Sequence, residues 1–165
     1  GFKYNLGDIQ AAIGRVQLKK LEAGIASRTR IAHRYRKLLA GCGAVELPED
    51  AANGRHAWHL YIVRLHLDQL DLTRDEFAAE LASRGVATSV HFIPVPLHPY
   101  FYDRFPDRAS LPETMRHFPR LLSLPMYPGL TDAQVEHVAA SVQEIAEANR
   151  RKCVAAASTT EKPAE

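Results

Sequence analysis

A polar turn followed by a long helical pattern is the first stretch whose residues could do chemistry. Lys3 and Asn5 lie in this turn. A lysine brings charge, an asparagine amide donates hydrogen bonds, and the first N–H groups of a helix point outward at the positive end of its dipole. The turn could therefore hold an anion or a cofactor. The alternative is that Lys3 and Asn5 are ordinary surface residues of a turn.

His91 is the second candidate, at the end of a segment that we expect to be a strand, residues 86–92 (VATSVHF). The chain then enters residues 93–112, which carry five prolines and are expected to be irregular. Strand ends that lead into loops commonly position functional side chains, and a loop this long in a compact domain favours a functional role. The alternative is a hydrogen-bonded structural histidine.

Two further histidines, His56 and His59, form an H-x-x-H pattern that could suggest zinc. Both flank the start of an expected strand over residues 57–65, where positions three apart point to opposite faces. A shared metal ion needs convergent ligands, so we expect no metal site here. Trp58, between them, is expected in the core.

Composition limits the classes of protein that this chain can be. It has 165 residues, a net charge of +2, and two cysteines, Cys42 and Cys153, without metal-ligand spacing. A reduced, cytoplasmic protein is the simplest interpretation. We see neither a signal peptide nor an apolar run that could cross a bilayer. The start at Gly1, without methionine, is expected either of a segment cut from a longer protein or of a deliberately chosen starting point.

The charge is locally uneven, because basic residues dominate positions 8–40: Arg15, Lys19, Lys20, Arg28, Arg30, Arg34, Arg36 and Lys37. Such a surface could steer phosphates, contact nucleic acid, or simply be a solvated exterior, which is the usual outcome. Aromatic residues are not interleaved with the basic ones as base-stacking platforms would be, so nucleic-acid binding is disfavoured.

The first helical stretch is expected to begin at Asp8 as its N-cap. It carries one apolar stripe from Ile9 to Val16 and a second from Leu18 to Ile25, on a different face. A helix that is apolar on two faces is usually packed between two bodies. We expect a break at residues 24–27, and then a second helix that ends near Gly41.

The remaining chain alternates strand and helix signals. Thr73 with Glu76 and Thr131 with Gln134 match capping boxes that start two helices. The expected elements are a loop over 44–56, strands over 57–65 and 86–92, helices over 74–84 and 113–121, a strand and turn over 122–130, and a last helix from Thr131 to about Arg150.

This order predicts an α+β fold, with a long N-terminal helical arm followed by a small sheet that has helices packed on one side. We assign residues 1–43 to the arm (a helix between domains or subunits, and the helix after it). Residues 44–150 form the small domain, and residues 151–165, which lack large apolar side chains, form a disordered tail.

Five segments, in order and spacing, resemble the DegT/DnrJ/EryC1/StrS aminotransferases, a family of pyridoxal-phosphate (PLP) enzymes that act on nucleotide-linked keto-sugars. They are GFKYNLGDIQAAIGRVQLKKL (1–21), AWHLYIVRL (57–65), GVATSVHFIPVPLHPYF (85–101), LSLPMYP (122–128) and GLTDAQVEHV (129–138). The chain is similar to the C-terminal third of these enzymes, the end of the inter-domain helix and the small domain. The large domain that carries the Schiff-base lysine is not in this sequence, and no lysine here stands in the family's S-x-H-x-x-K context.

The resemblance implies roles for several residues. Asn5 and Lys3 would reach the PLP phosphate held by the other subunit of a homodimer, and His91 would face the nucleotide-sugar substrate. His98 and Tyr100 are weaker candidates for contact with substrate or with a subunit interface. No residue of this chain is expected to be catalytic, so the chain should be inactive by itself.

Two hypotheses follow. In the first, the chain is the C-terminal part of an aminotransferase that moves an amino group from an amino acid, with L-glutamate as the expected donor, to a nucleotide-linked keto-sugar. Such sugars serve cell-surface polysaccharide, lipopolysaccharide or antibiotic synthesis. In the second, it is a non-catalytic module that keeps the fold for assembly or nucleotide binding. Neither hypothesis involves nucleic acid or a membrane as partner.

Overall fold

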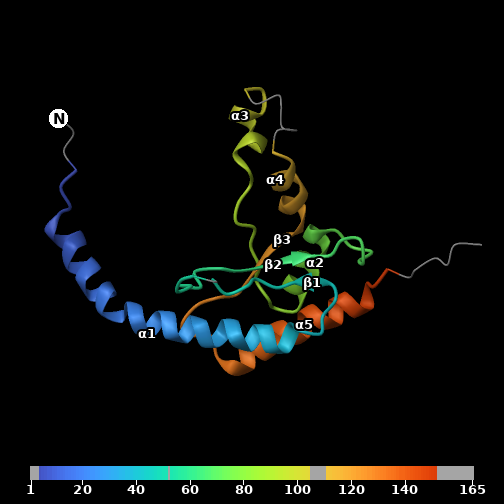
Figure 1. Cartoon of the computed structure of the whole chain (residues 1–165), viewed down its shortest axis with the longest axis horizontal. Helices are drawn as coiled ribbons and strands as arrows, with labels where there is room; N and C mark the ends of the chain where they lie inside the picture. Colours follow the sequence, from blue (N-terminus) through green and yellow to red (C-terminus); the bar gives the residue numbers. More distant parts are fainter. Residues whose placement is uncertain (1–3, 52, 105–110, 152–165) are drawn as a thin grey trace, which may run out of the picture.

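The computed structural model describes residues 4–51, 53–104 and 111–151 (Figure 1). Its helices are α1 (Asp8–Leu39), α2 (Arg74–Ser83), α3 (Pro99–Tyr102), α4 (Pro112–His117) and α5 (Asp132–Ala148), with 3-10 turns η1 (Val95–Leu97) and η3 (Phe118–Arg120). Strands β1 (Val45–Glu46), β2 (Tyr61–Leu65) and β3 (Leu121–Leu124) form one antiparallel sheet in that order. The expected α+β class is confirmed. Within the described ranges, no helix is long and apolar enough to cross a membrane.

α1 is one continuous helix of 32 residues, so the expected break at residues 24–27 is wrong. A distant loop accounts for the small residues there. Pro128 lies 3.7 Å from where a Cβ on Gly24 would stand, and the Ser27 hydroxyl donates to the Pro128 carbonyl at 2.5 Å. Asp8 is not the N-cap either. Gly7 takes that position, and Asp8 stands in the first turn, where its charge favours the helix dipole.

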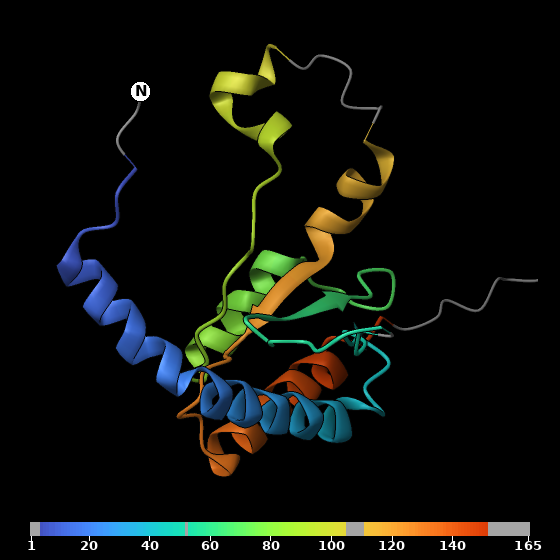
Figure 2. The same cartoon turned by 60° about the vertical axis from the view of Figure 1, so that its left-hand side comes forward.

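Only the C-terminal half of α1 packs against the rest of the chain, and its buried residues begin at Ile25. The N-terminal half projects away from the sheet and the other helices (Figures 1 and 2). Its large apolar side chains are exposed, namely Ile9, Ile13, Val16, Leu18 and Leu21, and so is Leu6 just before the helix. The first apolar stripe that the sequence indicated, and the second one except for the buried Ile25, are therefore on the surface of this chain.

α1 and α5 lie side by side and run in the same direction (Figure 1). Their polar contacts step along both helices together. Arg30 pairs with Asp132, Arg34 pairs with Glu136, and the Gln143 amide donates to the Leu38 carbonyl at 2.9 Å. These contacts and the apolar residues between the helices fix α5 beneath α1.

Both expected capping boxes are confirmed. At the start of α2 the Thr73 side chain accepts from the Glu76 N–H, and the Glu76 carboxylate accepts from the Thr73 N–H. Thr131 and Gln134 do the same for α5. Each reciprocal pair satisfies two N–H groups that a helix start leaves without backbone partners.

The sheet is smaller than expected. The predicted strand over 57–65 begins only at Tyr61, and the predicted strand over 86–92 is wrong, because that segment makes one isolated bridge, Ser89 to Ser123. The segment predicted as loop, 44–56, contains the two residues of β1. β2 is the central strand and supplies hydrogen bonds to both neighbours, which agrees with its predicted burial.

The core lies on one face of the sheet, where Tyr61, Val63 and Leu65 point toward α1, α2 and α5. Three aromatic rings lie at its centre. The Tyr61 ring is 5.0 Å from Tyr35 and 5.7 Å from Trp58, between centroids. Trp58 is 1% exposed, as expected from the sequence.

Of the segment predicted as irregular, the described residues 93–104 form a second, proline-rich arm that extends away from the sheet and carries η1 and α3 (Figures 1 and 2). The helix expected over 113–121 is shorter than predicted, since α4 ends at His117 and η3 leads directly into β3. Arg151 is held by Gln69, whose carbonyl accepts from its N–H at 2.9 Å. The rest of the predicted tail, residues 152–165, lies outside the described residues.

Tyr61 and Tyr35 provide a matched test of core polarity. The Tyr61 hydroxyl is buried without a described hydrogen-bond partner, whereas the Tyr35 hydroxyl donates to the Pro125 carbonyl at 3.0 Å. At neutral pH we expect Tyr61→Phe to leave the free energy of unfolding unchanged or raise it. Tyr35→Phe should lower it by about 1 kcal/mol. Urea denaturation followed by circular dichroism measures both.

The Tyr61→Phe variant should also differ from the unsubstituted chain in alkaline solution. Burial raises the pKa of Tyr61 to about 12 in the fold, above its ordinary value of about 10. Between these two values the unfolded chain binds fewer protons than the folded one, so stability falls as pH rises. Tyr61→Phe should reduce this loss. An unchanged slope of stability against pH from 10 to 12 would contradict the assignment.

Candidate functional site

His91 lies in an irregular segment that is attached to the edge of β3. Ser89 and Ser123 exchange backbone hydrogen bonds of 2.8 and 3.3 Å, which anchor this segment two residues before His91. The His91 Nδ1 then lies 2.8 Å from the Ser123 Oγ. The half-buried imidazole is thus held in one orientation, and its other nitrogen, Nε2, remains for a further partner.

A hollow of about 230 Å³ opens beside this pair. Its walls come from the segment before His91, from the end of β3 and from the turn after it: Leu60, Ala87, Thr88, Ser89, Ser123 and Met126. None of the described lysines (Lys19, Lys20 and Lys37) lines it. The hollow can therefore bind and orient a polar group, but it offers no amine nucleophile.

Ser123 is a site residue that the sequence interpretation missed. It is 4% exposed and follows two leucines in β3. A serine inside an otherwise apolar strand was the available signal, because a buried hydroxyl requires a partner. Its partner stands 32 positions away, and only the fold brings the two together.

His98 and Tyr100 do not line the hollow beside His91. His98 Nε2 contacts the Ile93 carbonyl at 3.2 Å, within the arm. The Tyr100 ring is 65% exposed and packs against its neighbours, with the Arg104 guanidinium 4.2 Å above it and the Phe101 ring 4.9 Å away. These contacts shape the tip of the arm. Both side chains stay accessible there, and a role in substrate or interface contact stays a prediction.

Asn5 is exposed at the projecting end of α1, while Lys3 lies outside the described residues. In both views this end lies far from the sheet and from the base of the arm (Figures 1 and 2). The Asn5 amide stands next to a helix start without a side-chain cap, so nearby N–H groups have no side-chain acceptor. These donors fit a phosphate group. A single copy of the chain does not combine Asn5 with His91.

The arginines in the C-terminal half of α1 are engaged by the rest of the chain. Arg30, Arg34 and Arg36 are paired with carboxylates of the body, the last with Asp50 at 2.5 Å. The Arg28 guanidinium donates to the Ala57 carbonyl at 3.0 Å. This half of the basic stretch is therefore structural, and it fastens α1 to α5 and to the loop before β2.

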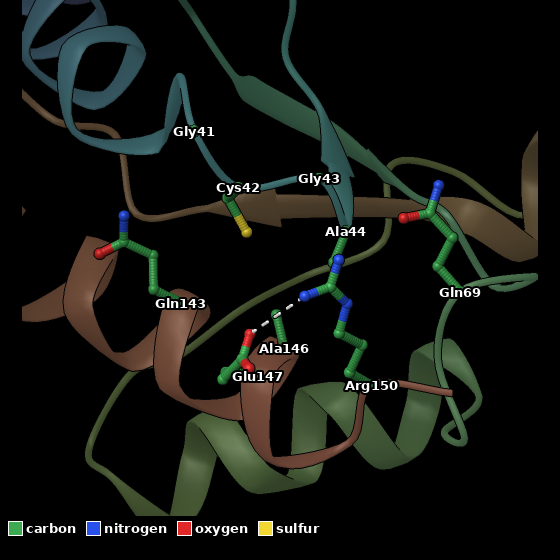
Figure 3. A pocket seen from close by; sticks show the side chains of 9 residues that line it. All are labelled: Gly41, Cys42, Gly43, Ala44, Gln69, Gln143, Ala146, Glu147 and Arg150. Atoms are coloured by element: carbon green, nitrogen blue, oxygen red, sulfur yellow. Dashed lines mark ion pairs between the residues drawn. The ribbon is translucent and has the colours of Figure 1, made fainter. Parts of the chain in front are cut away.

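A further hollow, of about 280 Å³, lies at the other end of α1, beside the turn that follows it (Figure 3). The Cys42 thiol points into it, and Glu147 pairs with Arg150 across it at 3.9 Å. Burial raises the pKa of the Cys42 thiol, which keeps it protonated and weakly nucleophilic. This hollow shares no lining residue with that of His91.

Comparison with known proteins identifies the class. The chain is 39% identical over 147 residues to the spore coat polysaccharide biosynthesis protein SpsC of Bacillus subtilis, covering 88% of this chain and 38% of SpsC. Among solved structures, S. venezuelae DesV in complex with a ketimine intermediate superposes with a TM-score of 0.78 at 34% identity, covering 87% of this chain and 37% of DesV. The PLP form of Spr1654 from Streptococcus pneumoniae gives 0.79 at 28%, covering 87% and 36%.

These matches define the fold as the C-terminal portion of a sugar aminotransferase. A model of the DegT/DnrJ/EryC1/StrS aminotransferase family matches residues 1–143. The chain belongs to this family, as its sequence segments indicated. It spans somewhat more than a third of the length of the relatives that it matches. One of the matching solved structures, that of Spr1654, is a PLP form.

Proposed function

We propose that this chain is the C-terminal part of a PLP-dependent aminotransferase that transfers an amino group from L-glutamate to a nucleotide-linked keto-sugar. The observation that carries the proposal is the family match over residues 1–143, nearly the whole described chain. The names of the relatives agree, since SpsC is a polysaccharide biosynthesis protein. The sugar product would enter cell-surface polysaccharide, lipopolysaccharide or antibiotic synthesis in the cytoplasm.

PLP would supply the electron sink for the amino transfer, and this chain would supply binding groups. Asn5 and Lys3 would donate to its phosphate, because amide and ammonium donors suit a dianion. The preceding large domain would provide the lysine that PLP chemistry requires, since no lysine lines the hollow of His91 among the described residues. The Nε2 atom of His91 would contact the nucleotide sugar, with Ser123 fixing the ring.

The projecting half of α1 supports assembly as a homodimer. The projecting end of α1, next to Asn5 in the chain, lies far from the segment that leads from α2 toward α3 and contains His91 (Figures 1 and 2), so a site that used both residues would draw them from different copies. The two exposed stripes of α1 would then face the preceding domain and the partner subunit. Gly14, which has no neighbouring atom within 4 Å in the described structure, would allow close approach of another backbone there.

The test uses the full-length protein encoded by the gene that contains this chain. Amino transfer is followed as 2-oxoglutarate formed from L-glutamate and a nucleotide-linked keto-sugar. His91→Ala should lower kcat/KM by about 10- to 100-fold, the effect of one lost hydrogen bond to a charged ligand. His59→Ala, on the exposed side chain before β2, is the matched control and should leave kcat/KM unchanged.

Two results would contradict the proposal. If the DNA upstream encodes no large domain in frame, the gene does not produce a complete aminotransferase. If the full-length protein shows no amino transfer but the isolated chain forms a stable, soluble assembly, the alternative hypothesis of an assembly module is favoured. The exposed stripes of α1 are the observation that motivates this alternative.

A further inference from the structure

The turn at Asn53 and Gly54 lies in the loop that joins β1 to β2, residues 47–60, and the proposed function does not use it. Both residues are exposed. Neither the Asn53 side chain nor the backbone N–H of Asn53 or Gly54 makes a hydrogen bond with another described residue. The Asn53 carboxamide can therefore rotate, and its Cγ atom can approach the backbone nitrogen of Gly54.

Gly54 is the residue that makes this approach easy. Glycine has no Cβ, so no side chain shields its nitrogen or restricts the backbone on either side of it. Apart from its chain neighbours, the nearest described atom to the place where a Cβ on Gly54 would stand is the Ala51 Cβ, at 4.0 Å. Gly54 also lacks the positive φ that disfavours a residue with a Cβ. The turn is therefore open around Gly54, and an alanine would fit there.

We propose that Asn53 is a site of spontaneous deamidation, with water as the co-reactant. Solvent base removes the proton of the Gly54 N–H, and the nitrogen attacks the Cγ atom of Asn53. The new N–C bond closes a succinimide ring, while the carboxamide nitrogen takes up a proton and leaves as ammonia. A water molecule then opens the ring at either of its two carbonyl carbons.

The position of the ring opening decides the product. Cleavage between the nitrogen and Cγ gives aspartate. Cleavage between the nitrogen and the main-chain carbonyl carbon gives isoaspartate, in which the backbone runs through the side chain. Each route replaces one ammonia by one water, so no oxidant or reductant takes part. Both products carry a carboxylate where Asn53 was neutral, and the modification adds a negative charge to the loop.

This loop is fastened to α1 on both sides of Asn53. Before it, Asp50 pairs with Arg36 at 2.5 Å. After it, Arg55 pairs with Glu22 at 2.6 Å. Isoaspartate lengthens the main chain between these ion pairs by a methylene, and the new carboxylate competes with Glu22 for Arg55. Modification should therefore loosen the loop from α1, and amide hydrogen exchange over residues 54–60 should become faster.

The two other asparagines of the chain provide an internal comparison. Asn149 precedes an arginine, and its carboxamide is restrained because it donates to the Ile145 carbonyl at 2.9 Å. Asn5 is exposed but precedes Leu6, whose side chain hinders attack by the backbone nitrogen. Asn53 should therefore be modified at least about tenfold faster than either of them.

The experiment incubates the 165-residue chain at mildly alkaline pH and follows its tryptic peptide 38–55 by liquid chromatography and mass spectrometry. The peptide should gain about one mass unit at Asn53, in two products that separate as the aspartate and isoaspartate forms. Gly54→Ala should slow the conversion at least about tenfold, because its Cβ hinders ring closure. The control is Gly41→Ala, in the same peptide and with no described atom within 4 Å, which should leave the rate unchanged.

Each of the following results would overturn the inference. If Asn53 converts no faster than Asn5, the turn does not promote the reaction. If Gly54→Ala leaves the rate unchanged, or if aspartate forms without isoaspartate, the reaction does not pass through the succinimide. If hydrogen exchange in the loop is the same before and after modification, the loop stays fastened to α1. Amino transfer enters none of these readouts, so their outcome is independent of the proposed function.

Discussion

Replacement of Trp58 by alanine is expected to lower the free energy of unfolding by about 3–5 kcal/mol, the usual cost of deleting a large buried aromatic side chain. The Trp58 ring is 1% exposed, lies against Tyr61 and stacks on His56 at 3.9 Å between centroids. Chemical denaturation followed by circular dichroism measures this loss.

The backbone at Trp58 allows a sharper comparison. Its φ is 49°, in the left-handed region that disfavours residues with a Cβ. Trp58→Gly should therefore cost no more than Trp58→Ala, although glycine in ordinary positions is worse than alanine by about 0.5–1 kcal/mol. His59→Ala, one residue further, should have little effect. If Trp58→Ala proved as mild as this control, the aromatic cluster would not be the centre of the core.

The second large effect concerns the projecting half of α1. Ile9 and Ile13 are 76% and 58% exposed and stand four residues apart on one stripe. We expect the isolated chain to self-associate through this surface, as exposed apolar patches do. Ile9→Glu with Ile13→Glu should weaken association by about a hundredfold or more, since burying each isoleucine contributes about 1.5–3 kcal/mol. Sedimentation velocity over a range of concentrations measures the change.

Charge alone must be separated from the loss of apolar surface. Gln10→Glu with Gln17→Glu adds the same two negative charges to exposed positions of the same helix half. This control should self-associate nearly as the unsubstituted chain does. If both double variants dissociate equally, electrostatic repulsion is the cause, and the apolar stripes are not the contact surface.

The parts of the fold that the sequence predicted correctly depend on short-range chemistry. The capping boxes at Thr73 and Thr131 involve residues three apart, so the sequence contains all of their determinants. The amphipathic pattern of α5 similarly follows from the spacing of its valines. The α+β class and the family could be inferred because several such segments occur in a fixed order.

The errors arose where distant residues decide the outcome. Gly24 and Ser27 favour a break locally. In the fold, both residues lie against Pro128, about a hundred residues away, and the helix is unbroken. Residues 86–92 have strand character, yet only Ser89 has a ladder partner. For the same reason the pairing of His91 with Ser123 could not be predicted, although each residue alone carried a signal.

The parallel contacts between α1 and α5 fix the C-terminal half of α1, so the direction of this half sets the position of the projecting N-terminal half. At 1.5 Å per residue the helix is about 48 Å long, and about half of this length extends beyond the last contact with the body. Rotation of the fixed half by about 5° would displace the free end by about 2 Å, and misplacement by about 1 Å can slow catalysis about a hundredfold. The pairs Arg30–Asp132 and Arg34–Glu136 lie far from Asn5. These two ion pairs nevertheless set the angle at which this chain would present Asn5 to a second subunit.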